Sequence, residues 1–101
     1  MINVTIDTSG CREIKLKGHA GAGEIGKDIV CAAVSALFRT LCYSLNQSGL
    51  PYKCSDNLDP DEGITISTTN SRAFPVFDYT INGLKMLSEE APEYVTFTNT
   101  Q

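Results

Sequence analysis

Apolar and polar residues alternate at the start of the chain. The alternation over residues 2–7 predicts a half-buried strand. A turn at Ser9-Gly10 follows, and Ile14 and Leu16 then alternate with lysines in a second predicted strand. Two such strands joined by a short turn predict an N-terminal hairpin.

The spacing becomes helical after residue 28. Apolar residues recur at intervals of three and four, and alanines between them permit close packing. We expect Asp28 to be the N-cap and the helix to end near Gln47, before the sequence Ser48-Gly49-Leu50-Pro51. This start would put Cys31 in the first turn. The apolar positions are Val30, Val34, Leu37, Leu41 and Leu45.

The second half of the chain repeats the order of two strands and a helix, and then adds a strand. An acidic turn separates the two strands, and Asn82-Gly83 weakens the helix prediction because glycine costs about 1 kcal/mol relative to alanine. The predicted elements are strands over 52–55 and 63–67, a helix over 74–90 and a strand over 94–97.

The order ββαββαβ predicts an α+β fold with two layers, a mixed sheet and two helices on one face. No repeat or linker interrupts the sequence. We therefore expect residues 1–101 to form a single domain.

Charge argues against a nucleic-acid partner. Eight Lys and Arg residues stand against twelve Asp and Glu residues, and the net charge is −4. The cations are scattered, whereas a nucleic-acid-binding domain needs a basic patch. A basic protein or peptide is a better partner for such a surface.

The N-terminus and the length of the apolar runs predict the cellular location of the protein. The first residues read as a strand and not as a signal peptide, and we expect no apolar run to approach the length of a membrane span. We therefore expect a cytoplasmic protein with no membrane partner.

Four cysteines are many for 101 residues, but they form no CxxC pair. In a reducing cytosol we expect them to be thiols, and one histidine with dispersed cysteines gives no support for a zinc site. Cys42 fits a small buried hydrophobe. Cys11 and Cys54 lie beside predicted turns and have no evident role.

Cys31 and His19 are the candidate catalytic pair. A thiol in the first turn of a helix is biased toward thiolate, because the helix dipole and the unpaired N–H groups favour the anion. An imidazole at the end of the preceding strand can take or hold the proton. Taken alone, the cysteine is better explained as a buried structural thiol, and the histidine fits an isolated surface or core residue.

The stretch GHAGAGEIGKDIVCAAVSAL resembles the signature of the ribosomal-processing cysteine protease (Prp) family. The family pattern has Gly-His-Ala at a strand end, a short loop with glycine, Asp-Ile-Val-Cys-Ala, and a serine four residues after the cysteine. This chain matches it without departure. The matching positions are Gly18-His19-Ala20, Asp28-Ile29-Val30-Cys31-Ala32 and Ser35. The resemblance extends more loosely over all 101 residues.

The resemblance implies that Cys31 is the nucleophile and that His19 is the general base and then the general acid. Asp28 either caps the helix or orients His19. Ser35 lies one turn after Cys31, where it can hydrogen-bond near the thiol or simply fill space.

The glycine-rich segment is a candidate substrate loop. Its spacing fits neither a phosphate-binding loop nor a dinucleotide fingerprint. A flap that admits a peptide and then closes is the better interpretation. Its glycines are Gly18, Gly21, Gly23 and Gly26.

By resemblance, the expected activity is removal of the short N-terminal extension of large-subunit ribosomal protein twenty-seven, after two Phe and a small residue. The reaction would pass through a thioester and need no metal or other cofactor. The family also forms homodimers, which the sequence pattern alone does not indicate.

Three alternatives stay open. A non-catalytic ribosome-assembly module could hold a ribosomal protein and would tolerate loss of Cys31. A redox-sensing protein would use the activated thiol alone. An RNA-binding domain would bind with a steep salt dependence, which the charge balance disfavours.

Overall fold

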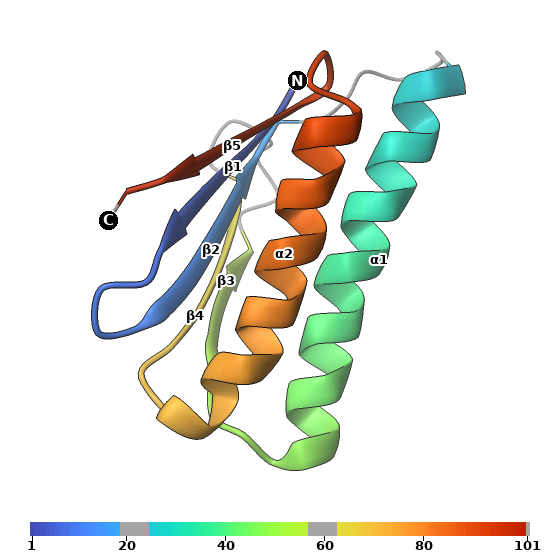
Figure 1. The fold of residues 1–101 in the computed structure, drawn as a ribbon. Coiled ribbons are helices and arrows are strands. Elements are labelled where there is room, and N and C mark those ends of the chain that lie inside the picture. Colours follow the sequence, from blue (N-terminus) through green and yellow to red (C-terminus); the bar gives the residue numbers. More distant parts are fainter. Residues whose placement is uncertain (19–24, 57–62, 101) are drawn as a thin grey trace.

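The computed structural model describes residues 1–18, 25–56 and 63–100, without the side chains of 25–28 and 56. Five strands form one layer, and two α-helices lie side by side on one face of it (Figure 1). A short 3₁₀ helix, Ser71–Ala73, leads into the second helix. The elements are β1 (Ile2–Asp7), β2 (Arg12–Lys17), α1 (Ile25–Ser48), β3 (Lys53–Asp56), β4 (Ile64–Thr68), α2 (Phe74–Glu90) and β5 (Val95–Asn99).

The sheet is mixed, and its strand order is β3-β4-β2-β1-β5. β1 and β2 form the predicted antiparallel hairpin, and β4 and β3 extend it with antiparallel pairs. β5 returns from α2 and pairs parallel with β1. The α+β class, the element order and the placement of both helices on one face are therefore confirmed.

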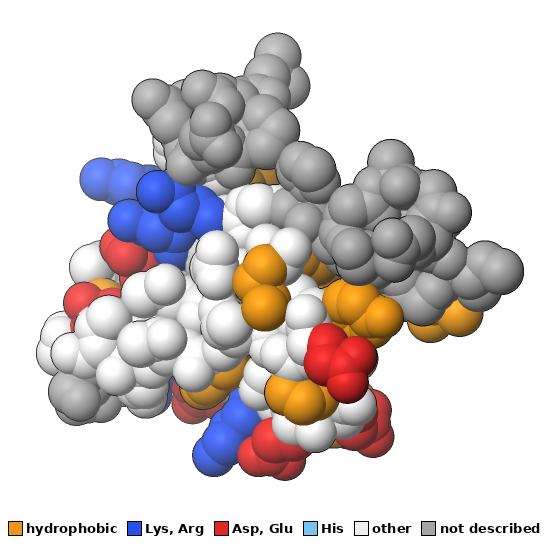
Figure 2. Space-filling model, turned by 90° about the horizontal axis from the view of Figure 1, so that it is seen from above, with side chains coloured by type: hydrophobic (Ala, Val, Ile, Leu, Met, Phe, Trp, Pro, Cys, Tyr) orange, Lys and Arg blue, Asp and Glu red, His pale blue; other side chains and the backbone are white. Residues whose placement is uncertain are grey.

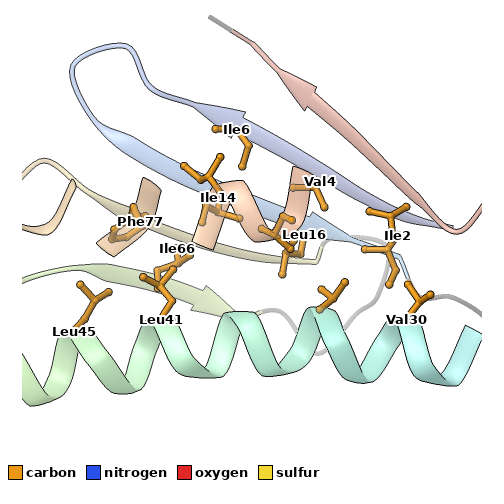
Figure 3. Packing of buried hydrophobic residues seen from close by; sticks show 14 of the residues in the cluster. Ile2, Val4, Ile6, Ile14, Leu16, Val30, Leu41, Leu45, Ile66 and Phe77 are labelled. Carbon is orange, nitrogen blue, oxygen red and sulfur yellow. The ribbon is translucent and has the colours of Figure 1, made fainter. Parts of the chain in front are cut away.

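The core lies between the two layers, as Figure 3 shows. Alternate strand residues point toward the helices because side chains of a strand alternate between its faces. The apolar stripe of α1 covers them, and Phe77 of α2 is completely buried among them. The buried positions include Ile2, Val4, Ile6, Ile14, Leu16, Val30, Val34, Leu41, Leu45, Ile66 and Phe77.

An ion pair fixes the beginning of β2 against α2. The Arg12 guanidinium donates to both carboxylate oxygens of Asp78, with a shortest contact of 2.6 Å. The same group lies 4.3 Å from the ring centre of Phe74. These two contacts connect the sheet to the first two turns of α2.

The first helix begins four residues earlier than predicted. α1 starts at Ile25, so Asp28 lies inside the helix and is not its N-cap. Gly26 is also helical and does not belong to the loop. The prediction was wrong because aspartate is favourable in the first turn as well as at the cap, where the helix dipole attracts its charge.

One segment of α1, Ile29–Ser48, is long and apolar enough to cross a membrane by length and composition. This finding corrects the expectation that no such run exists. Cysteines and alanines raise its apolar content, while Val30, Val34, Leu41 and Leu45 of the same segment are buried in the core. The composition is therefore also that of a helix that covers a sheet.

Gly83 marks the contact between the two helices. α2 has the predicted bounds, and glycine is tolerated within it because a Cβ there would lie 2.9 Å from a terminal methyl of Leu37 on α1. The helices approach closely at this point, since no side chain separates them.

Gly18 fixes the point at which β2 ends. Its φ of +84° favours glycine, and a Cβ would collide with the backbone carbonyl of Met1. The chain thus leaves the sheet at Gly18, in contact with the beginning of β1.

We expect Gly83→Val to lower the free energy of unfolding by about 1–3 kcal/mol, because the added side chain must displace Leu37. The neighbouring Asn82 is exposed, so Asn82→Val should cost no more than about 0.5 kcal/mol. Urea denaturation of both variants measures the difference. Equal losses would contradict a close helix contact at Gly83.

We expect Gly18→Ala to cost at least about 3 kcal/mol, since it adds both a left-handed strain and a backbone collision. Gly10 also has a positive φ, of +73°, but nothing lies near its Cβ position. Gly10→Ala should therefore cost only about 1 kcal/mol. Thermal denaturation compares the two variants, and a Gly18→Ala loss no larger than that of Gly10→Ala would contradict the contact with Met1.

Candidate active site

Cys31 lies on α1 beside the residues that fasten this helix to the sheet. Val30 and Val34 are buried, and Figure 3 shows Val30 next to Ile2 at the start of β1. Cys31 itself is half-buried and packs against this core. The packing of its neighbours therefore sets the position of the thiol.

The same end of the sheet receives the segment that precedes His19. Gly18 lies against Met1 and Ile2, and Val30 packs beside Ile2. The residues directly before His19 and Cys31 are thus both held at the beginning of β1. His19 itself lies outside the described residues, as do Gly21 and Gly23.

The helix start changes the electrostatic argument for Cys31. With α1 beginning at Ile25, Cys31 falls in the second turn, where its backbone N–H faces the carbonyl four residues earlier. Among the described residues, the unpaired N–H groups belong to residues 25–27 instead. The expectation that Cys31 lies in the first turn is therefore wrong, and the helix dipole acts on its thiol from one turn further away.

Of the two predicted supporting residues, Ser35 is fully described and Asp28 is described only by its backbone. Ser35 is exposed and lies one turn after Cys31, on the same side of α1. Asp28 precedes Cys31 by three residues in the helix, and its side chain is outside the described part. The seven-residue spacing also puts Phe38 on this side, a neighbour that the sequence reasoning missed.

Two other cysteines are poor candidates for a nucleophile. Burial, followed by the charge of Cys54, raises the pKa of Cys42. Burial, followed by Asp7 and then Glu13, raises the pKa of Cys11. A raised pKa keeps a thiol protonated near neutral pH, and only the thiolate attacks. Cys42 also packs half-buried against the core, as predicted.

The end of the molecule that carries Cys31 has apolar and charged regions (Figure 2). Apolar side chains gather near the middle of this view, and basic and acidic groups lie beside one another at its left and lower edges. Met1 is 50% exposed and Ile29 is 66% exposed. Glu89 and Glu90 end α2, Glu93 lies between α2 and β5, and all three are exposed.

Cys31 lines neither of the two hollows described below. One, of about 390 Å³, lies where β2 begins and β4 ends, and its lining includes Cys11, Glu13 and Lys53. Another lies between the helices beside Thr40 and Tyr79. Within residues 1–18, 25–56 and 63–100, no group of three His, Cys, Asp or Glu side chains could hold a metal ion.

The family model described as Cysteine protease Prp matches residues 1–96. Nine chains of solved structures match the fold. One is SMU.848 from Streptococcus mutans, with 32% identity and a TM-score of 0.77, over 98% of this chain and 93% of that one. A search of curated proteins finds no significant match.

Two further structures are of an essential ribosomal processing protease Prp from S. aureus. The one with a covalently linked product peptide has 26% identity and a TM-score of 0.78, over 99% of this chain and 100% of that one. The one with a substrate peptide has 24% identity and a TM-score of 0.79 over the same shares, and it bears on the fold alone. The match over 96 residues and the 32% identical relative establish the family. The chain belongs to the Prp family of cysteine proteases.

Proposed function

We propose that this protease processes a ribosomal protein, and that its substrate is the N-terminal extension of large-subunit ribosomal protein twenty-seven. The observation that carries the proposal is the family match over residues 1–96. A relative with 26% identity over its whole length is titled a ribosomal processing protease and holds a covalently linked product peptide.

The proposed nucleophile is Cys31 and the proposed base is His19. Three observations support Cys31: it stands in the complete family motif, it lies near the start of α1, and its neighbour Val30 is anchored on Ile2. Gly18, next to His19, approaches the same end of β1. Nucleophilic catalysis needs a base beside the thiol, and the position of Gly18 at this strand end supports His19 as that base.

The reaction begins with attack of the Cys31 thiolate on the carbonyl carbon of the scissile bond. The tetrahedral intermediate collapses, the C–N bond breaks, and the protonated His19 gives its proton to the departing amine. The N-terminal part of the substrate remains attached to Sγ as a thioester.

Water completes the cycle. Neutral His19 removes a proton from water as the water attacks the thioester, and the thiolate then leaves. We propose the N–H groups of residues 25–27 as donors to the oxyanion, because these groups lie in the first turn and have no partner within the helix. Asp28 and Ser35 are proposed as supporting residues, through their position one turn before and one turn after Cys31.

The proposal extends to location and assembly. A cytoplasmic homodimer fits a substrate that is made and assembled in the cytoplasm. Tyr43 on α1 and Tyr79 on α2 are 66% and 83% exposed on the helix layer, and exposed aromatic residues favour an interface. The acidic residues near the end of α2 suit a basic peptide.

We expect the purified protein to cut a peptide that carries the extended N-terminus of ribosomal protein twenty-seven once, after the two Phe and the small residue. Cys31→Ala and His19→Ala should each lower kcat/KM by about 10⁴-fold or more while circular dichroism stays unchanged. Mass spectrometry identifies the products and their rates.

The matched control is Cys11→Ala, which removes a thiol of raised pKa at the beginning of β2 and should retain full activity. Equal peptide binding without cleavage in wild type and in Cys31→Ala would favour the non-catalytic assembly module. An active His19→Ala enzyme would exclude the proposed pair.

A further inference from the structure

The side of α1 that carries Cys31 faces away from α2. Leu37 contacts α2, and Thr40 and Ser44 line the hollow between the helices. With 100° between successive residues, Cys31 and Cys42 lie on the opposite side of the buried stripe. We call the side with Cys31, Ser35, Phe38, Cys42 and Asn46 the outer flank of α1.

The outer flank lies alongside β3. Tyr52, the residue directly before β3, donates its hydroxyl to Asn46 Oδ1 at 2.9 Å. Cys54 of β3 is close enough to Cys42 for its charge to act on that thiol. Figure 3 shows β3 running beside α1 in the opposite direction, from the level of Leu45 toward that of Val30.

β3 is an edge strand. It pairs with β4 on one side, and on its other side no strand pairs with it among the described residues. In an antiparallel pair, every second residue directs both its N–H and its C=O away from the partner. The four residues Lys53–Asp56 therefore present two residues with outward hydrogen-bonding groups, which an extended peptide can complete.

The distances connect this edge to the nucleophile. Cys31 and Cys42 are eleven residues apart, which is about three helical turns and roughly 16 Å. An extended peptide rises about 3.3 Å per residue, so about five residues cover this interval. Ser35 and Phe38 lie on the flank between the two cysteines.

We propose that the edge of β3 and the outer flank of α1 bind the substrate polypeptide as an added strand, about three to six residues from the bond that Cys31 attacks. This inference rests on the proposed function, because it takes Cys31 as the nucleophile. The other edge strand, β5, lies at the far side of the sheet from β3, and it packs against α2.

An added strand has a recognisable pattern of specificity. The backbone of the added peptide hydrogen-bonds to β3 at every second residue. The side chains of the peptide alternate between the helix side and the open side of the sheet. Side chains on the helix side would meet Phe38. The enzyme then selects an extended, accessible segment and tolerates variation at positions that face solvent.

The test replaces single backbone N–H groups of the substrate by N–CH₃. The probe is a labelled peptide with the extended N-terminus of ribosomal protein twenty-seven, and its Kd is measured by fluorescence anisotropy with the Cys31→Ala variant. The informative positions lie three to six residues from the cut, on one side of it. There, methylation of every second N–H should weaken binding roughly tenfold, whereas methylation of the N–H groups at the intervening residues should leave Kd within about twofold. Uniform effects, or effects confined to the two residues at the cut, would overturn the inference.

Cleavage by the wild-type enzyme is measured in parallel with the unmethylated peptide. Failure to cut would contradict the proposed function, while the methylation pattern in the variant would still decide whether the β3 edge binds the peptide. The two failures are therefore distinguishable.

Alkylation of Cys54 locates the peptide on the protein. Cys54 is exposed on β3, and saturating peptide should slow its reaction with iodoacetamide at least about fivefold; Cys11, two strands away, should react unchanged. Unaltered alkylation of Cys54 would overturn the proposal. The proposal would also be overturned if, without peptide, Cys54 reacted more slowly as the protein concentration rises. A second copy of the chain would then occupy the β3 edge.

Discussion

The packing of α1 on the sheet is the constraint on which the rest of this structure depends. One stripe of the helix, from Val30 to Leu45, fills the space above the alternate apolar residues of β1, β2 and β4. The free energy of burying this stripe fixes both the axial position and the rotation of the helix. Cys31 follows Val30 directly, so the same contacts that form the core place the thiol at the end of the sheet where β1 begins.

Once the rotation of α1 is fixed, the two sides of the helix face different elements. One side meets α2 closely because Gly83 leaves room for Leu37. The other side carries Cys31 and Cys42 and lies beside the edge strand β3. A protease needs a nucleophile and a surface that holds an extended chain beside it. In our proposal, α1 supplies the nucleophile, and its outer flank together with the β3 edge supplies the surface.

Much of the fold could be predicted from the sequence, because the alternation in β1 and the helical spacing of α1 and α2 reflect a one-sided core. The bounds of α2 were correct, and Gly83, which weakened that prediction, has its reason in Leu37, a residue 46 positions earlier in the chain. No local pattern contains such a contact. The start of α1 was wrong for a related reason: Asp28 suits a cap and a first turn equally, and the choice depends on residues before it. The candidate site was indicated by the motif, whereas the outer flank depends on how α1 and β3 lie together.

The central claim is that Cys31 forms a covalent intermediate with its substrate. Rapid mixing with the peptide of ribosomal protein twenty-seven, an acid quench and intact-mass analysis would test it most directly. The account predicts an adduct with the mass of the N-terminal fragment, located on Cys31 by digestion and lost on treatment with hydroxylamine. Cleavage with normal turnover but no adduct on Cys31, or an adduct on another cysteine, would contradict it.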